Sequence, residues 1–175
     1  RELLAQFRST DGSYDVIVPG SGGKDSAYTA HILKYKYGMN PLTVTWAPHL
    51  YTDIGWKNMQ EWMHTGGLDN ILYTPNGKLH QEMTKNAFHN LLHPFQPFIV
   101  GQRIIGPAMA KKFNVKLVMY GENQAEYGNA IEENTNPIMN MNFFSSDDAL
   151  SMKFGGVSMQ DYIDKGTYTK DDFAP

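Results

Sequence analysis

Several features are missing from this 175-residue chain, and each absence excludes some classes of structure or function. It has no cysteine, which excludes disulfides, thiolate-ligated zinc and cysteine-persulfide chemistry within these residues. It has no apolar run of about 18 residues. It also has no signal-peptide pattern, so we expect no membrane insertion and a cytoplasmic location. Lysine and arginine are not clustered and the net charge is -3, so a protein that grips nucleic acid by its phosphate backbone is not expected.

The hydrophobic pattern alternates between strands and helices along most of the chain. The length suffices for one core that covers both faces of a sheet. Apolar, β-branched runs predict strands at residues 16–18, 42–46, 70–74, 116–120 and 138–143. Helical spacing predicts helices within 1–13, at 25–37, 53–64 and 78–92, in a segment that ends at 113, and at 158–165. We therefore predict a Rossmann-like α/β fold, with an open parallel sheet of about five strands and helices on both faces.

The main functional motif lies at residues 15–26, which read D-V-I-V-P-G-S-G-G-K-D-S. A buried strand is followed at once by a glycine-rich turn and then by a helix. The start of such a helix presents unpaired backbone N–H groups and a positive dipole end to the turn. The pattern therefore predicts an anion site, with phosphate as the expected anion.

The spacing of the glycines decides which phosphate loop this is. A Walker loop needs a glycine at position 18 and a dinucleotide fingerprint needs one at position 25, but Val18 and Asp25 stand there. What remains is S-G-G-K-D-S, which runs from Ser21 to Ser26. This segment resembles the SGGxDS signature of the PP-loop ATP pyrophosphatases, a family that cleaves ATP between the α and β phosphates.

The end of the strand at 42–46 is expected to form another part of the nucleotide site. In open α/β sheets, ligands bind beyond the carboxyl ends of the strands, where the strand order reverses. We therefore expect Val44 and the residues up to Pro48 to lie beside the first loop. The PP-loop resemblance implies that main-chain groups hold the adenine here. Trp46 is a candidate to cover the base, and an ordinary core tryptophan is the alternative.

A carboxylate-rich loop follows the strand predicted at 116–120, and it reads G-E-N-Q-A-E-Y-G from Gly121 to Gly128. Such a loop beside a phosphate loop is suited to hold Mg²⁺ or to direct acceptors at a sugar or an amine, and a solvated turn is the alternative. Arg103 is a further candidate, because arginine can bind a phosphate or a carboxylate bidentately. A surface arginine without a role fits the sequence equally well.

Four segments together resemble the N-acetyl sugar amidotransferases of surface-polysaccharide assembly, the WbpG-like branch of the PP-loop group. They are S-G-G-K-D-S at 21–26, P-F-I-V-G-Q-R at 97–103, the loop at 121–128, and G-G-V at 155–157. The resemblance implies an ATP- and Mg²⁺-dependent ligase of lipopolysaccharide O-antigen synthesis that releases AMP and pyrophosphate. Its substrate would be a nucleotide-linked N-acetyl sugar, converted to an acetamidino sugar with ammonia from a partner glutaminase subunit. The sequence leaves the oligomeric state open, with a homodimer as one alternative.

Under this resemblance each candidate residue has an expected role. Fixed N–H donors from the glycine loop and the Lys24 ammonium would stabilise the departing pyrophosphate. Asp25 would cap its helix or, with Glu122, bind Mg²⁺. The expected catalytic residues are Lys24, Asp25, Glu122 and Glu126. The expected nucleotide-binding residues are Ser21, Gly22, Gly23, Lys24, Asp25, Ser26, Val44, Trp46 and Gly121. Arg103, Asn123 and Tyr127 are expected to bind the sugar.

Members of this family are longer than this chain and usually carry cysteine pairs outside the nucleotide domain. The sequence begins at Arg1 without a methionine, and we expect a fragment of a longer protein. Residues 1–144 would form the PP-loop nucleotide-binding domain, and residues 145–175 would begin a C-terminal extension. Two other functions stay open: another PP-loop ligase, tRNA-modifying or NAD-synthetase-like, and a module that binds ATP or AMP without turning it over.

Overall fold

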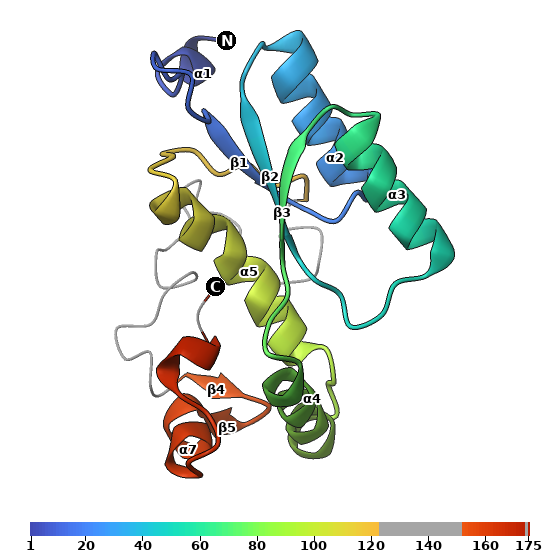
Figure 1. Cartoon of the computed structure of the whole chain (residues 1–175), viewed down its shortest axis with the longest axis vertical. Helices are drawn as coiled ribbons and strands as arrows, with labels where there is room; N and C mark the ends of the chain where they lie inside the picture. The colour runs from blue at the N-terminus through green and yellow to red at the C-terminus, as the bar shows by residue number, and fades with distance from the viewer. Residues whose placement is uncertain (123–151, 174) are drawn as a thin grey trace, which may run out of the picture.

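Three parallel strands form the centre of the molecule (Figure 1). The computed structural model describes residues 1–122, 152–173 and 175. The strands are β1 (Val16–Pro19), β2 (Pro41–Trp46) and β3 (Asp69–Tyr73), and they lie side by side in the order β1-β2-β3. Their register places Ile17 opposite Leu42, and Val44 opposite Ile71. The predicted α/β class with a parallel sheet is confirmed for these three strands.

Helices cover both faces of this sheet, because parallel neighbours need crossover connections. On one face lie α2 (Lys24–His31), its π-helical continuation η1 (Ile32–Lys36), and α3 (Asp53–His64). On the other face lies α5 (Gln96–Lys112), whereas α4 (Gly77–Leu91) lies beyond the end of β3. The helix predicted within 1–13 is a single turn, α1 (Glu2–Ala5), because the polar segment after it does not continue the apolar spacing.

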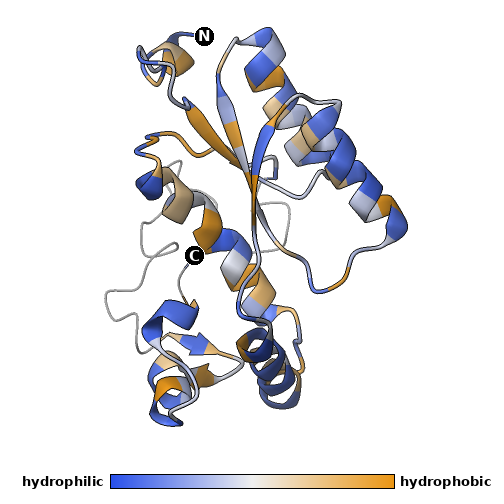
Figure 2. Cartoon of the chain, viewed as in Figure 1, coloured by the Kyte–Doolittle hydropathy of each residue, from blue (hydrophilic) through white to orange (hydrophobic). Residues whose placement is uncertain are grey.

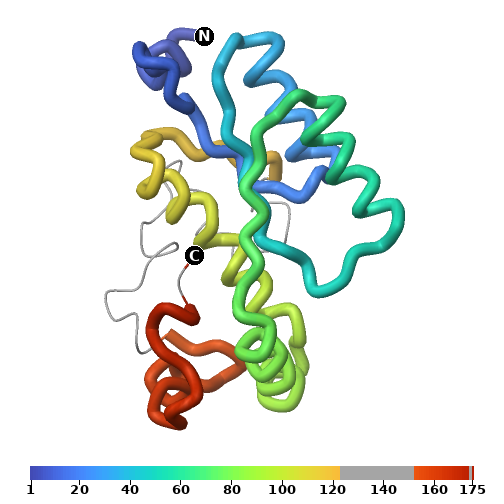
Figure 3. The backbone as a smooth tube through the Cα atoms, in the orientation of Figure 1, coloured from blue at the N-terminus to red at the C-terminus, as the bar shows by residue number. Residues whose placement is uncertain are grey.

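The strand predicted at 116–120 is formed only as a single bridge. Val118 pairs in parallel with Ile17, on the edge of β1 opposite to β2. The Ile17 N–H donates to the Leu117 carbonyl, and the Met119 N–H donates to the Ile17 carbonyl, both at 2.9 Å. Figure 3 shows the backbone running from the end of α5 back toward β1. The strand predicted at 138–143 lies outside the described residues, so a sheet of five strands stays a prediction.

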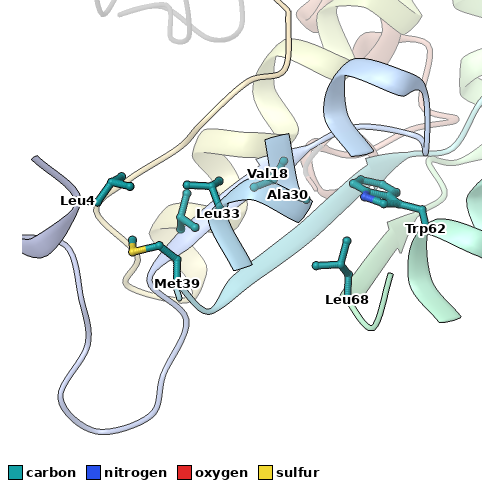
Figure 4. Close-up of a cluster of buried hydrophobic side chains, with 8 residues drawn as sticks. Leu4, Val18, Ala30, Leu33, Met39, Trp62 and Leu68 are labelled. Carbon is teal, nitrogen blue, oxygen red and sulfur yellow. The ribbon is translucent and has the colours of Figure 1, made fainter. Parts of the chain in front are cut away.

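The core has one layer on each face of β1, as expected of a central parallel strand. Figure 4 shows the layer on the α2 and α3 side, where Val18 lies among side chains from both helices. Its buried members are Leu4, Val16, Val18, Ala30, Leu33, Met39, Trp62 and Leu68. The layer toward α5 contains Ile17, Leu42, Val44, Trp46, Ile105, Met109, Ala110 and Val115. In Figure 2, where the ribbon is coloured by hydropathy, β1 is mostly hydrophobic and the visible part of the α4 ribbon is mostly hydrophilic.

The described part of the C-terminal extension packs against α4. It contains the two-stranded antiparallel pair β4 (Lys153–Phe154) and β5 (Val157–Ser158), the helix α7 (Met159–Asp164), and the 3₁₀ turn η5 (Lys170–Phe173). Ser158 and Asp161 form a capping box at the start of α7, close to the predicted helix start at 158. A third core cluster joins Leu79 and Met83 of α4 to Phe154, Tyr162 and Tyr168. In the ranges described above, no helix has the length and apolarity that spanning a membrane requires.

Candidate functional site

Residues 20–23 connect β1 to α2 in a tight turn. The Gly20 N–H donates to the Val44 carbonyl at 2.9 Å, which ties the turn to the neighbouring strand. Gly22 has a φ of 82°, a conformation that glycine adopts without strain. Gly23 is the N-cap of α2, and as a glycine it has no side chain with which to cap the helix. The first turn of α2 therefore directs its backbone N–H groups beyond the end of β1.

This glycine loop is closely packed on its protein side and open at Gly23. A β-carbon added at Gly22 would lie 2.9 Å from the Asn58 carbonyl oxygen of α3. One added at Gly20 would lie 2.3 Å from Ser26 Cβ and 3.1 Å from the Trp62 ring. At Gly23, by contrast, an added β-carbon would meet no described atom within 4 Å. The helix start is therefore accessible to a ligand while α3 supports the loop from behind.

The polar residues of the motif lie on the exposed side of the loop. Lys24 Nζ and Asp25 Oδ1 are 3.1 Å apart and form an exposed ion pair. Exposed ion pairs contribute little to stability, so this pair adds little to the stability of the fold. The Ser26 hydroxyl donates to the Gly23 carbonyl at 3.1 Å, and Ser21 is exposed. All four residues are positioned by the same β1–α2 connection.

The second loop lies directly against the first. A β-carbon built on Gly121 would lie 2.5 Å from the Asp25 carbonyl carbon and 2.6 Å from the Ser26 backbone nitrogen. Glu122 follows immediately and is exposed. The remaining predicted residues of this loop, Asn123, Glu126 and Tyr127, lie outside the described residues. The structure thus brings the start of the carboxylate-rich loop to the N-terminus of α2.

The strand order explains why these two loops meet. From β1, the chain continues to β2 and β3 on one side, and returns at 117–119 on the other side. The order therefore reverses at β1, and ligands of open α/β sheets bind at such reversals, beyond the carboxyl ends of the strands. The glycine loop follows the first of the two diverging strands, and Gly121 follows the second.

Tyr120 connects the second loop to α5. Its hydroxyl donates to the Arg103 carbonyl at 3.2 Å, and burial raises the pKa of Tyr120 to about 12, so the phenol stays protonated. A β-carbon at Gly106 would lie 2.9 Å from the Tyr120 hydroxyl and 2.7 Å from the Pro19 ring. Arg103 is therefore held on a helix that packs against the ends of β1 and of the 117–119 segment.

Val44 and Trp46 contribute through the backbone and the core. The Val44 side chain is fully buried, and its carbonyl accepts the bond from Gly20. Trp46 is 8% exposed, and its ring lies against Gly101 of α5, where an added β-carbon would come 2.2 Å from the ring. Trp46 thus occupies a core position on the α5 face of the sheet.

Residues that the sequence analysis did not single out also shape this edge. Trp62 supports Gly20, and the backbone at Asn58 supports Gly22. His80, in the first turn of α4, is buried beside Trp46 at 6.1 Å between ring centroids. Burial, with a smaller contribution from the nearby His49, lowers the pKa of His80 to about 4. His80 lies in α4 after the Asn76 N-cap, and no local sequence pattern predicts its burial.

Asp25 lies in the first turn of α2, and Glu122 follows Gly121, which contacts that turn. Mg²⁺ that arrives with a nucleotide is usually bound by one or two carboxylates together with phosphate oxygens, so this donor set has a suitable size. Among the described residues, no three histidine, aspartate or glutamate side chains cluster closely enough to hold a metal ion by themselves. Any Mg²⁺ held by Asp25 and Glu122 would therefore share its coordination with the ligand.

The described part of the site is thus an open helix N-terminus, an exposed Lys24–Asp25 pair and a second loop that begins at Gly121. This arrangement can bind a phosphorylated ligand through backbone amides and one ammonium group. Searches with the sequence found no matching protein-family model and no matching curated protein.

Proposed function

We propose that the protein is an ATP-dependent, AMP-forming amidotransferase that converts the acetamido group of a nucleotide-linked sugar to an acetamidino group. The observation that carries this proposal is the contact of Gly121 with the backbone of Asp25 and Ser26. It joins an S-G-G-K-D-S phosphate loop to a carboxylate-rich loop at one strand-order reversal. A phosphate site and polar groups for a second substrate are then adjacent, as group transfer from ATP requires.

The proposed reaction has two steps. The acetamido carbonyl oxygen attacks the α-phosphorus of ATP, the bond to the β-phosphate oxygen breaks, and pyrophosphate leaves. Ammonia then attacks the activated carbon, AMP leaves with the former carbonyl oxygen, and a proton is released. No protein side chain forms a covalent bond in either step, so the protein acts by positioning and by electrostatic stabilisation.

The residues of the glycine loop suit the first step. Negative charge grows on the departing pyrophosphate, and the first-turn N–H groups of α2 supply fixed donors for it. The Lys24 ammonium, on the exposed side of the loop, adds a positive charge. Asp25 and Glu122 would hold Mg²⁺, which neutralises part of the phosphate charge when it is bound. Asn123, Glu126 and Tyr127 are proposed to handle the sugar and the ammonia.

The ammonia donor is proposed to be a separate glutaminase subunit. Free ammonia is mostly protonated at neutral pH, and the protonated form is not a nucleophile. The chain contains no cysteine that could serve as a glutaminase nucleophile. A cytoplasmic setting, where nucleotide sugars and ATP occur together, fits this role.

The direct test is an assay with protein, ATP, Mg²⁺, ammonium and a nucleotide-linked N-acetyl sugar. We expect AMP and pyrophosphate to form only when the sugar is present, together with a product sugar whose mass reflects replacement of oxygen by NH. We expect Lys24→Ala to abolish pyrophosphate release. Lys36→Ala is the matched control, because Lys36 lies at the far end of the same helical segment.

Other outcomes of this assay would assign other functions. AMP formation that requires tRNA instead of the sugar would identify another PP-loop ligase. Saturable ATP binding without AMP would identify a nucleotide-binding module. Undiminished pyrophosphate release by Lys24→Ala would remove the phosphate loop from the proposed mechanism.

A further inference from the structure

Helix α3 contacts the glycine loop and extends past it. A β-carbon added at Gly22 would lie 2.9 Å from the Asn58 carbonyl oxygen and 3.0 Å from the Met59 Cα, so the loop is level with the second turn of α3. Because α3 follows β2, it begins at the carboxyl end of the sheet, at Asp53. At about 1.5 Å per residue, its start extends roughly 7 Å beyond Gly22, toward the region where ligands of such sheets bind.

One stripe of α3 faces α2, and Figure 1 shows the two helices beside each other on one face of the sheet. Three residues of this stripe, Asn58, Glu61 and Thr65, line a groove together with Gly22 and Ala27. Their spacing is that of one helix face. Side chains on a helix lean toward its N-terminus. The Asn58 side chain therefore leans from the level of Gly22 toward the ligand side of the loop.

The Asn58 side chain makes no contact that would explain it as part of the fold. It is exposed, and its carboxamide forms no hydrogen bond with any residue that the structure describes. Asparagine is a poorer helix former than alanine, so α3 is less stable with asparagine at this position. Residues that act against a local preference without a structural gain are expected at functional sites.

The chemistry of a carboxamide suits an anion bound beside it. Its NH₂ group offers two donors without adding a charge. Glu61, the next residue of the stripe, is a carboxylate that would repel an anion, and it pairs with Lys57 at 3.8 Å. Of the three stripe residues, Asn58 is the one whose backbone meets the glycine loop. It is therefore the member of the stripe suited to contact a phosphate held at that loop.

We propose that Asn58 is a further ligand-binding residue, and that its side-chain NH₂ donates to a phosphate oxygen of a nucleotide held at the start of α2. This inference rests on the proposed function and adds a third contact region to its phosphate site. Gly121 meets the first turn of α2 at Asp25 and Ser26, whereas α3 meets the loop at Gly22. The phosphates are then contacted from α2, from the second loop and from α3.

The test is calorimetric titration of the full chain with ATP and Mg²⁺, and separately with inorganic pyrophosphate. We expect Asn58→Ala to weaken the binding of both about tenfold, because a hydrogen bond to a charged group is lost. Asn58→Asp keeps the shape but places a carboxylate beside the phosphates, so it should weaken binding at least about tenfold further at low salt. This extra loss should shrink at about 0.5 M salt, because salt screens the repulsion.

Gln60→Ala is the matched control on the same helix. Gln60 is not among the residues that line the groove, and its side chain bonds to His64 at 3.2 Å. Its replacement should leave the affinity for ATP and for pyrophosphate unchanged. Unchanged ATP affinity in Asn58→Ala, or equal losses in Asn58→Ala and Asn58→Asp at low salt, would overturn the proposal.

Urea unfolding separates binding from folding. Since alanine is the better helix former, Asn58→Ala should be as stable as the unaltered protein or slightly more stable. A clear loss of stability would show a structural role for Asn58 and would also overturn the proposal.

The outcomes for Asn58 and for the proposed function can be told apart. Weaker ATP binding by Asn58→Ala, in a protein that forms no AMP, would support Asn58 as a binding residue and overturn only the enzymatic proposal. Sugar-dependent AMP formation together with unchanged ATP affinity in Asn58→Ala would do the reverse. No ATP binding by the unaltered protein would overturn both.

Discussion

Gly121 lies directly against the backbone of Asp25, with room for a hydrogen but not for a methyl group. A β-carbon on Gly121 would approach the Asp25 carbonyl carbon to 2.5 Å. The contacted atoms belong to the first turn of α2, so they cannot rotate away as a side chain would. This contact sets the spacing between the two loops of the proposed site.

Gly121→Ala should therefore separate the loops. We expect the substitution to lower the free energy of unfolding by about 1–3 kcal/mol, as overpacking does. We expect it to reduce sugar-dependent pyrophosphate release by about a hundredfold, because a small misplacement of reacting groups has effects of that size. Gly77→Ala is the matched control, since it has open space around it and should retain turnover. Normal turnover by Gly121→Ala would show that the loop contact is not needed for catalysis.

Gly22→Ala should mainly lower stability, whereas Gly23→Ala should mainly weaken ATP binding. At Gly22, the φ of 82° and the Asn58 carbonyl at 2.9 Å make alanine unfavourable, so stability should fall by at least about 1 kcal/mol. At Gly23, alanine meets open space and should change stability by less than about 1 kcal/mol. Its methyl group would nevertheless occupy the approach to the helix N-terminus and weaken ATP binding. Urea unfolding and calorimetric ATP titration measure the two effects, and unchanged ATP affinity in Gly23→Ala would contradict this placement of the phosphates.

Stability should fall as the pH drops from 6.5 toward about 4, because the pKa of His80 is lowered from 6.5 to about 4 in the folded protein. Burial is the main cause, and His49 at 4.7 Å between ring centroids adds to it. In this pH window the unfolded chain binds a proton that the folded chain does not, so protonation favours unfolding. Asp172, which lines the same small cavity as His80, has a pKa lowered below 3.8 by its Thr169 and Asn76 hydrogen bonds, so its contribution is lost below this window.

Urea midpoints measured across this pH range for the unaltered protein and for His80→Gln test the assignment. Glutamine does not titrate, so the slope of stability against pH should become smaller in this variant. His64→Gln should keep the original slope, because His64 is exposed. An identical slope in the unaltered protein and in His80→Gln would show that another group dominates.

Tyr162→Phe should loosen the contact between the C-terminal segment and α4. The Tyr162 hydroxyl is fully buried, donates to the Phe154 carbonyl at 3.0 Å and accepts from Asn86 at 2.8 Å. Its removal leaves two buried groups without a partner, so we expect a loss of about 1–3 kcal/mol in the free energy of unfolding. Tyr28→Phe on the exposed side of α2 should have almost no effect. Hydrogen exchange would locate the loss in α7, and unaltered exchange there would contradict the role of this hydroxyl.

Most of the described secondary structure follows from local pattern. The strand predicted at 42–46 and the helix predicted at 53–64 agree with β2 and α3 within a residue. The segment at 116–120 has the same apolar character but forms a single bridge, at Val118. Apolar character predicts that a segment will be buried, whereas the extent of its pairing depends on neighbours elsewhere in the chain.

Part of the candidate site is likewise predicted by local sequence, and the rest depends on contacts between distant residues. The spacing of Gly20, Gly22 and Gly23 predicts a turn before a helix, because positive φ and helix capping are local properties. His80 carries no such signal, since a single histidine in a helix is usually solvated. Its burial depends on Trp46 of β2 and on the packing of residues 152–173 against α4.

The sequence by itself determined that a glycine-rich turn stands between a buried strand and a helix, because residue type and spacing act over a few neighbouring positions. Only the tertiary structure decided that Gly121 meets this loop and that Trp46 and His80 share a cavity. Those contacts join residues far apart in the chain. They exist because the strand order reverses at β1 and because the C-terminal segment folds back onto α4.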